Sequence, residues 1–320
     1  MRKLRNSIAD VPGIEVGHAQ NEQALTGCTV VLCRKGAVAG VDVRGGAPGT
    51  RETDLLNPGN LVQQVHAILL SGGSAFGLDA ASGVMRWLEE KKIGYQTRNG
   101  IVPIVPAAIL YDLDLGDSKI RPDAKMGYQA CVNASEDETA EGVVGAGTGS
   151  SVGKMLGMSQ AMKSGVGGAS VHLGKGIVVG AIAAVNALGD VYDPQTGEFV
   201  AGIRSEKKTL GSLRSLTLKR APKRNTVIGV VAVNANFTKA ETTRLAQMAH
   251  DGLARAIRPA HTQYDGDTIF ALATGGKKVD LSLVGAYAAE VFAEAIVRAV
   301  KASVSAGGLP GLAGHVRRSK

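Results

Sequence analysis

The chain has 320 residues, of which 44% are hydrophobic and 20% charged, so it can bury a large core and is too apolar to remain disordered. The apolar runs Val65–Leu78 and Gly176–Gly189 are short and broken by polar residues or glycine, which argues against a transmembrane helix. No signal-peptide stretch opens the chain, and the cysteines lack zinc or disulfide-scaffold spacing. We therefore expect a cytoplasmic protein with free thiols at Cys28, Cys33 and Cys131.

The formal net charge of +8 comes almost entirely from one segment. Residues 204–224 contain eight Lys and Arg against the single Glu206, so this segment alone carries +7. It has no aromatic residue, whereas a nucleic-acid interface is expected to place basic residues and aromatics together on a folded face. We interpret the segment as an exposed basic loop, with an RNA or DNA contact surface as the alternative.

In the first part of the chain, strands of small apolar residues precede an amphipathic helix. Thr29–Cys33 and Ala37–Asp42 flank the tripeptide Arg-Lys-Gly and predict a hairpin of two short strands. Val65–Leu70 predicts a third strand. A helix is expected from about Leu78 to Lys91, because its apolar residues recur on one face.

The second part continues the alternation. Ile177–Val185 predicts a long strand, and Val227–Ala235 is so uniformly apolar and β-branched that we expect a strand covered on both faces. Thr238 and Glu241 form a capping box that opens a helix, which we expect to end at Pro259. A last helix is predicted from about residue 281 to 302, with Asp280 as its cap.

Glycine and other small residues indicate how these elements pack. The chain has 43 glycines and only 4% aromatic residues, which favours tightly stacked layers with close backbone contacts. Helices on both sides of the sheets, in the α+β or α/β class, are the expected architecture. No composition shift marks a domain boundary apart from the basic loop, so residues 1–320 are predicted to form a single domain.

Two glycine-rich segments resemble known functional loops but miss their spacing. In Gly147–Lys154 five residues separate the outer glycines where a phosphate loop has four, and Met155 stands where Ser or Thr would hold magnesium. Ser74 follows a strand and precedes a helix, like a nucleophile elbow, but its flanking glycines are one residue too far apart. The simpler interpretation is that Ser74 caps the helix.

The histidines do not indicate a metal centre. None of the six forms a pair with the spacing of a zinc hydrolase, and His250 is interpreted as a structural residue of its helix. We predict neither a metal ion nor a cofactor. Any chemistry then has to come from hydroxyls, carboxylates, amines and amides.

The junction between the basic loop and the buried strand carries a candidate nucleophile. The hydroxyl of Thr226 can attack the carbonyl of Asn225, exchange the amide for an ester, and release a new amino terminus after hydrolysis. A threonine hydroxyl needs a neighbouring base, and an α-amine with a pKa of about 7.7–8.0 provides one in the same residue. Asn-Thr dipeptides are common, so this dipeptide does not by itself identify a cleavage site.

A pair of acids offers a second candidate. Asp265 and Asp267 are two residues apart before the apolar segment Ile269–Ala273, so on an extended backbone their side chains point the same way. Two neighbouring carboxylates can hold and polarise a hydroxyl or an ammonium group, and one of them raises the pKa of the other. The alternative is an ordinary polar turn before a strand.

Five long segments together resemble the P1 family of peptidases, the group of the L-aminopeptidase/D-esterase, the β-aminopeptidases and the nylon-oligomer hydrolase. The resemblance runs from about residue 8 to about residue 310. The segments that carry it are Ile8–Ala19 (IADVPGIEVGHA), Asp42–Pro58 (DVRGGAPGTRETDLLNP), Val65–Glu90 (VHAILLSGGSAFGLDAASGVMRWLEE), Gly145–Gly157 (GAGTGSSVGKMLG) and Asn225–Ala235 (NTVIGVVAVNA).

The resemblance implies a fold and a maturation step. It implies an α+β fold, a four-layer αββα sandwich similar to that of N-terminal-nucleophile hydrolases but connected differently. It implies a precursor that cuts itself into a larger fragment, residues 1–225, and a smaller one, residues 226–320. The two fragments are expected to stay together and to form a homo-oligomer, a tetramer of such αβ pairs.

The resemblance also implies roles for individual residues. The cut falls between Asn225 and Thr226, and Thr226 is the nucleophile. A threonine here, with the Asp265 and Asp267 pair, is more similar to the nylon-oligomer hydrolase than to the aminopeptidases. Asn186 matches the amide that supports the oxyanion, and Lys154 and Tyr111 match further active-site positions. Lys154 as a surface cation and Tyr111 as a core residue are the alternatives.

We therefore expect a self-processing amide hydrolase acting on peptides or ω-amino-acid oligomers. An aminopeptidase or esterase of the β-aminopeptidase type is the alternative, and it needs an acidic group for the free amine of its substrate. A non-catalytic member that binds a small ligand is a further alternative. Neither nucleic acid nor a membrane is expected as a partner.

Overall fold

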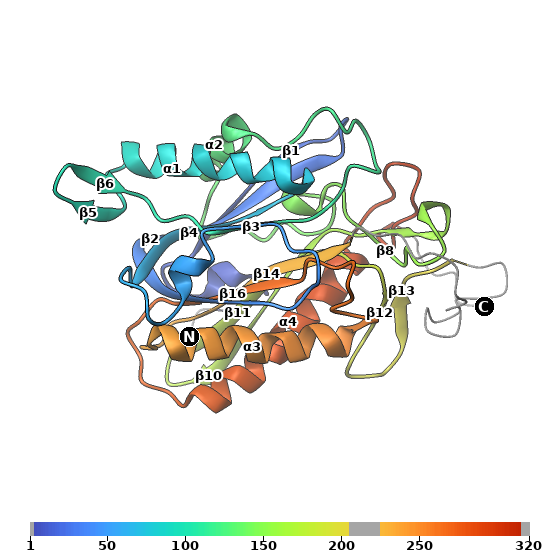
Figure 1. Ribbon diagram of the computed structural model, residues 1–320. Helices are drawn as coiled ribbons and strands as arrows, with labels where there is room; N and C mark the ends of the chain where they lie inside the picture. The colour runs from blue at the N-terminus through green and yellow to red at the C-terminus, as the bar shows by residue number, and fades with distance from the viewer. Residues whose placement is uncertain (1–2, 205–224, 315–320) are drawn as a thin grey trace.

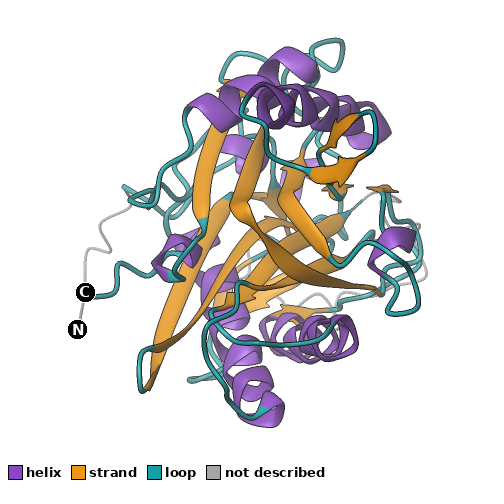
Figure 2. Ribbon diagram, turned by 90° about the vertical axis from the view of Figure 1, so that its left-hand side faces the viewer, coloured by secondary structure: helices purple, strands orange, loops and turns teal. Residues whose placement is uncertain are grey.

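The computed structural model describes residues 3–204 and 225–314, which form two layers of strands between two layers of helices. The helices α1 (Ala80–Glu90) and α2 (Ala124–Val132) cover one outer face. The helices α3 (Lys239–Ala256) and α4 (Leu281–Lys301) cover the other (Figure 1). Turned by 90°, the strands lie between these two helix pairs (Figure 2). Residues 205–224, most of the predicted basic loop, lie outside the described residues.

The strand layers belong to one nine-stranded sheet with the order β10-β11-β14-β16-β2-β4-β7-β3, and β1 pairs with β2 beside this path. Its strands are β1 (Glu15–Asn21), β2 (Thr26–Val43), β3 (Thr50–Arg51), β4 (Gln64–Ser71), β7 (Ala107–Ile109), β10 (Val166–Gly174), β11 (Ile177–Asn186), β14 (Thr226–Val233) and β16 (Thr268–Ala273). The remaining strands form small sheets: β5 (Tyr95–Thr97) with β6 (Gly100–Val102), β8 (Ser151–Val152) with β9 (Met162–Lys163), and β12 (Asp190–Tyr192) with β13 (Phe199–Ala201) and β15 (Ile257–Arg258).

The long strand β2 connects the two layers, and here the predicted hairpin is wrong. Instead of turning back, the chain continues as one strand whose pairing with β4 shifts register between Leu32 and Ala37. Gly36 adopts φ +80° in this bulge, and Arg34 and Lys35 are exposed. Polar residues and a glycine between two strand patterns mark a bulge as well as a turn, and a bulge bends a strand without reversing it. The first half of β2 pairs with β1 and β4, and the second half pairs with β16.

Three separate apolar cores fill the spaces between the four layers. One lies between α3, α4 and the strands β10, β11, β14 and β16. A second lies between the two strand layers, and a third lies between α1, α2 and the strands β1, β2 and β4. The central strand β14 shows the arrangement directly, because Val227 and Val231 face the helices whereas Ile228 and Val230 face the other strand layer. The prediction of a strand covered on both faces is confirmed.

The helix ends follow their sequence signals closely. Thr238 and Glu241 form the predicted capping box at α3, and Asp280 caps α4 by accepting from the N–H of Leu283. Helix α3 ends at Ala256, before Pro259, because the next residues leave the helix to form β15. The three cysteines are buried free thiols. Within the described residues no helix is both long and apolar enough to cross a membrane.

Candidate active site

The predicted nucleophile lies at the start of the central strand. Thr226 is the first residue of β14 and is 4% exposed. Strand β14 runs antiparallel to β11 on one side and parallel to β16 on the other. Asn186, the last residue of β11, is directly opposite Thr226 in this register. The sheet therefore fixes the backbone at Thr226 and places Asn186 next to it.

The Asn225–Thr226 peptide bond is held by a short backbone bridge. The Thr226 hydroxyl donates to the Asn225 carbonyl oxygen, so it lies beside the carbonyl group that precedes it. The same oxygen accepts a 3.0 Å hydrogen bond from the N–H of Gly266, and the Asn225 N–H donates to the Tyr264 carbonyl at 3.0 Å. These two bonds form an isolated parallel bridge between Asn225 and Asp265.

Asp267 anchors the backbone just after Thr226. One of its carboxylate oxygens accepts from the N–H of Val227 at 2.8 Å. The other accepts from the backbone N–H of His261 at 3.0 Å and lies 2.8 Å from the Nδ1 of the same residue. With a carboxylate as the acceptor, Nδ1 carries the proton in this pair. Asp267 is 2% exposed, so its carboxylate is shielded from water. These three N–H donors take the place of the hydrogen bonds that water would make.

The buried carboxylate of Asp265 accepts fewer of these hydrogen bonds than that of Asp267. Its carboxylate accepts from the N–H of Thr262 at 2.8 Å and from the Thr262 hydroxyl at 2.6 Å. Burial, with the nearby charge of Asp267, raises the pKa of Asp265 to about 6, although the Thr262 bonds and the charge of Lys154 oppose this shift. Asp265 therefore changes charge close to neutral pH.

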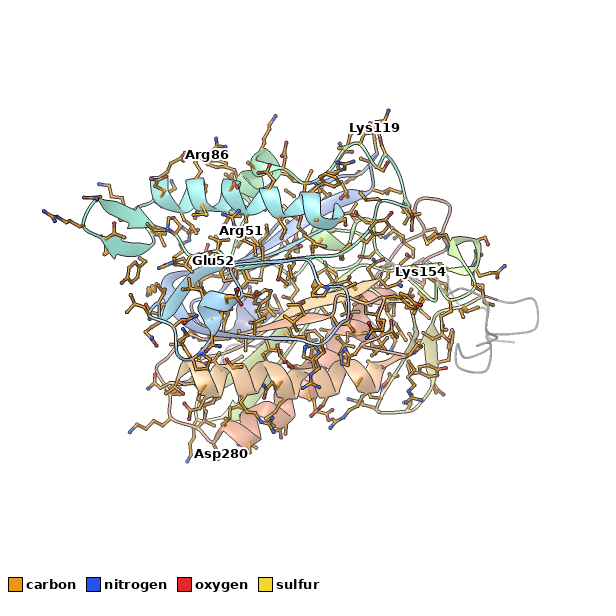
Figure 3. All side chains as sticks on the ribbon, in the orientation of Figure 1. Arg51, Glu52, Arg86, Lys119, Lys154 and Asp280 are labelled. Atoms are coloured by element: carbon orange, nitrogen blue, oxygen red, sulfur yellow. The ribbon has the colours of Figure 1, made fainter. Side chains whose placement is uncertain are left out.

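Lys154 is buried, with 3% of its surface exposed, so it is not the surface cation that was the alternative. Figure 3 shows it at the end of the sandwich where β8 and β12 lie, opposite the β5–β6 hairpin. Its Nζ donates to the carbonyl oxygen of Asn186 at 3.0 Å and to its side-chain oxygen at 2.7 Å. Burial lowers the pKa of Lys154 to about 7, although the charges of Asp265, Asp114 and Asp112 oppose the shift.

The side chain of Asn186 is held at both ends. Its oxygen accepts from Lys154 and from the N–H of Ser151 at 3.1 Å, and its Nδ2 donates to the backbone carbonyl of Tyr111 at 2.6 Å. An amide nitrogen has two hydrogens, so one donor remains beyond the Tyr111 bond. The Tyr111 hydroxyl donates to Asp114 at 3.4 Å. Tyr111 is half-buried, so it is not the core residue that was the alternative.

A cavity of about 390 Å³ opens at this end of the sheet, and Thr226 and Asn225 are part of its wall. Of the other predicted residues only Tyr111 lines it, whereas Asp265, Asp267, Asn186 and Lys154 are buried outside the lining set. No charged side chain is among the described lining residues: Ala47, Ser74, Phe76, Ile109, Tyr111, Leu113, Asn225, Thr226 and Tyr264. At Phe76 the guanidinium of Arg121 lies 3.7 Å from the ring centroid.

Ser74 lies on the cavity wall, but the prediction that it caps the helix is wrong. It begins a short 3₁₀ helix, Ser74–Asp79, and the residue at the cap position is Gly73, which has no side chain. Ser74 itself adopts φ +56°. A non-glycine residue in this region is strained, a state that is common at functional sites.

The segment Gly147–Lys154 is not a phosphate loop. It contains the short strand β8, whereas a phosphate loop opens a helix. The carbonyls of Gly147 and Ser150 accept from the Nζ of Lys163 at 3.2 and 2.8 Å. A phosphate site needs N–H groups aimed at the ligand, whereas here carbonyl oxygens surround a cation. Among the residues that the structure describes, no group of three His, Cys, Asp or Glu side chains could hold a metal ion.

Two residues of the site were not singled out from the sequence. Gly266 had one available signal, its place between the two aspartates. His261 had none, because the residues between it and Asp267 show neither a helical nor a strand pattern of apolar residues. In the structure His261 also packs against His250 of α3, with the ring centroids 4.9 Å apart.

Comparison with known proteins identifies the family. Residues 6–315 match the model of peptidase family S58. The chain belongs to this family. This chain is 45% identical to an uncharacterised aminopeptidase of Mycobacterium tuberculosis, and the match covers 95% of this chain and 96% of that protein. It is 30% identical to a 6-aminohexanoate-oligomer endohydrolase of Kocuria sp., over 91% of this chain and 85% of that protein.

Two solved structures share the S58 chain's fold. The β-aminopeptidase of a Burkholderia species superposes with a TM-score of 0.70 at 25% identity, covering 98% of this chain and 92% of that one. The L-aminopeptidase/D-Ala-esterase/amidase of Ochrobactrum anthropi, described as a variant of the Ntn hydrolase fold, also has a TM-score of 0.70, at 22% identity over 93% and 86%. The predicted αββα fold is confirmed. Membership of a peptidase family also confirms the predicted class of enzyme, a hydrolase of amide bonds.

Proposed function

We propose that this S58 hydrolase cuts its own chain between Asn225 and Thr226 and then uses Thr226 as an N-terminal nucleophile. The observation that carries the proposal is the Thr226 hydroxyl, which hydrogen-bonds to the carbonyl oxygen of Asn225 at the wall of the cavity. An attacking hydroxyl is most effective when it is already held beside its target carbonyl.

Self-cleavage proceeds by an N-to-O acyl shift. The Thr226 oxygen attacks the Asn225 carbonyl carbon, the bond from that carbon to the Thr226 nitrogen breaks, and the nitrogen takes up the hydroxyl proton. Water then hydrolyses the ester, which leaves a carboxylate on Asn225 and restores the Thr226 hydroxyl. The products are the fragments 1–225 and 226–320.

Turnover reuses the freed amine. The Thr226 hydroxyl attacks the substrate carbonyl while its own α-amine accepts the proton. The substrate C–N bond then breaks, the amine leaves with that proton, and water hydrolyses the acyl-enzyme to the free acid and restores the Thr226 hydroxyl. Asp267 keeps the backbone after Thr226 in place, and Asp265 and Lys154 set the charge around the new amine. Asn186, held by Lys154 opposite Thr226, is the proposed side-chain donor to the oxyanion.

The two fragments are expected to remain one folded unit. Strand β14 of the smaller fragment pairs along its length with β11 of the larger one, and β16 pairs with β2 in the same way. Both pairings lie between filled apolar cores. A cut before β14 therefore breaks one peptide bond and leaves the packing intact. We also propose that the αβ pairs assemble into a tetramer, which light scattering of the purified protein tests.

For the substrate, we propose an amide bond within a peptide or an ω-amino-acid oligomer. An enzyme that requires a free α-amine needs a carboxylate to pair with it, and the described cavity lining contains none. We expect an N-acetylated peptide amide to be hydrolysed at least as fast as the same peptide with a free amine. A strict requirement for the free amine would instead indicate the aminopeptidase alternative.

The decisive test is the intact mass of the purified protein under denaturing conditions, with Thr226→Ala as the matched control. We expect the wild-type protein to give two pieces, the smaller one beginning at Thr226, and the variant to give one uncut chain without hydrolase activity. An uncut wild-type chain that binds ligands without turnover would indicate a non-catalytic member of the family. A variant that is still cut before residue 226 would rule out this nucleophile.

A further inference from the structure

We propose that the backbone N–H of Gly266 is the oxyanion donor of self-cleavage, and that position 266 has to be glycine to leave room for the Thr226 hydroxyl. This inference rests on the proposed cut at Asn225–Thr226. It assigns a catalytic role to the middle residue of the Asp265-Gly266-Asp267 segment.

The first observation is the direction of the donor. The N–H of Gly266 already donates to the Asn225 carbonyl oxygen at 3.0 Å in the uncut chain, so it points at the oxygen on which the negative charge develops. This bond belongs to an isolated bridge, because the pairing of β14 with β16 begins only at Ile228 and Thr268. The Gly266–Asn225 hydrogen bond is therefore not part of the regular sheet. It is set by the conformation of the loop before β16.

The second observation is that this loop is fixed from several directions. The Asp265 side chain binds Thr262, and the Asp267 side chain binds Val227 and His261. The backbone carbonyl of Asp265 also accepts from the N–H of Ala47 at 2.8 Å. A donor held this way does not have to reorganise when negative charge develops on the carbonyl oxygen.

The third observation concerns space. A Cβ atom at position 266 would lie 2.9 Å from the Thr226 hydroxyl oxygen and 2.8 Å from the carbonyl oxygen of Ala47. Both distances are shorter than real Cβ contacts. The φ angle of Gly266 is not in the left-handed region, so it is the close approach of Thr226 and Ala47, not the backbone conformation, that requires glycine.

The chemistry explains why this donor matters. Before attack the Asn225 oxygen accepts from both the Thr226 hydroxyl and Gly266. As the hydroxyl oxygen forms its bond to the carbonyl carbon, the π electron pair moves to the carbonyl oxygen and the hydroxyl proton leaves for the Thr226 nitrogen. The Thr226 bond to that oxygen is then lost, and the Gly266 N–H remains to stabilise the oxyanion until the C–N bond breaks.

The sharpest test removes only this N–H. Glycolic acid in place of Gly266, introduced into the full-length chain, replaces the amide N–H with an ester oxygen. The matched control is glycolic acid at Gly275, whose N–H donates to the Ala235 carbonyl at the same 3.0 Å. We expect the change at 266 to slow self-cleavage by about 100- to 1000-fold, followed by intact mass over time, and the control to stay within about threefold of wild type. Equal rates for the two esters would overturn the proposal.

A second variant keeps the proposal testable if the ester chain does not fold. We expect Gly266→Ala to give a folded but uncut chain, with a near-ultraviolet circular dichroism spectrum like that of Thr226→Ala. A folded Gly266→Ala chain that is cut at the wild-type rate would contradict the spatial requirement. These results differ from a failure of the proposed self-cleavage itself. In that case the wild-type chain would stay uncut, or the Thr226→Ala chain would still be cut.

Discussion

Thr226 has buried charged side chains on two sides, and the two groups are held in opposite ways. In the aspartate loop, residues 261–267, the Asp267 carboxylate accepts three N–H groups that stabilise its negative charge. On the lysine side, Lys154 donates to two neutral oxygens of Asn186. Its positive charge therefore lacks a directly bonded counter-ion among these contacts, and burial lowers its pKa to about 7.

The difference indicates a division of roles. A carboxylate that binds the backbone N–H next to a reacting residue and a second position in its own loop mainly positions that residue. A lysine whose pKa is near 7 changes charge under physiological conditions, so it is suited to tuning the charge of the site. Changes at Asp267 should therefore affect self-cleavage at every pH, and changes at Lys154 should appear mainly as altered pH dependence.

The largest effect is expected for Asp267→Asn. An amide can accept from only one of the two partners on opposite sides, so either Val227 or His261 loses its acceptor. We expect self-cleavage to slow by at least about 100-fold through misplacement of Thr226. In the uncut Thr226→Ala background, the free energy of unfolding should fall by about 3 kcal/mol. The control is Asp251→Asn on the exposed face of α3, and equal rates for the two variants would contradict the positioning role.

The next effect concerns Lys154 and is read from stability against pH in the uncut Thr226→Ala background. The folded pKa of about 7 lies below the ordinary value of 10.5, so between these values the unfolded chain binds more protons. The cost of burying the charge is fully present below pH 7 and is relieved as the pH rises. Compared with a Lys154→Met variant, the parent should gain up to about 1.4 kcal/mol per pH unit between pH 7 and 9. Parallel curves would show that Lys154 does not titrate there.

Asp265 should show a smaller dependence in the acid range. Its folded pKa of about 6 lies above the ordinary 3.8, so between these values the folded chain binds more protons. The stability of the parent relative to Asp265→Asn should therefore fall as the pH rises from about 4 to 6, by up to about 1.4 kcal/mol per unit. Urea titrations of both chains at pH 4, 5 and 6 measure it. A difference that stays constant over this range would place the pKa of Asp265 near its ordinary value.

The sequence predicted the layers well because local and global signals agree there. The apolar strand at Val227, the capping box at Thr238 and the cap at Asp280 all appear where expected. The hairpin failed because Gly36 serves a bulge as readily as a turn, and only the pairing of β2 with both layers distinguishes the two.

The site was predictable only where its residues lie on regular elements or in recognisable segments. Thr226 and Asn186 are at strand ends, and the aspartates have a readable spacing. The contributions of His261 and Gly266 depend on how one loop folds back on itself. Contacts made by a loop across the fold leave no period in the sequence, so these residues emerge only from the structure.

The smallest effect is expected for Tyr111→Phe, which tests whether the cavity lining acts on substrate binding and not on self-cleavage. Asn186 contacts the backbone carbonyl of Tyr111, and this bond survives the loss of the hydroxyl. Self-cleavage should therefore change by less than about twofold, which corresponds to the smallest free energy expected for one hydrogen bond. Because the side chain lines the cavity, KM for an amide substrate should rise by about 2- to 10-fold with little change in kcat. A Tyr111→Phe chain that cuts itself much more slowly than wild type would reverse this assignment and place the Tyr111 hydroxyl in the self-cleavage reaction.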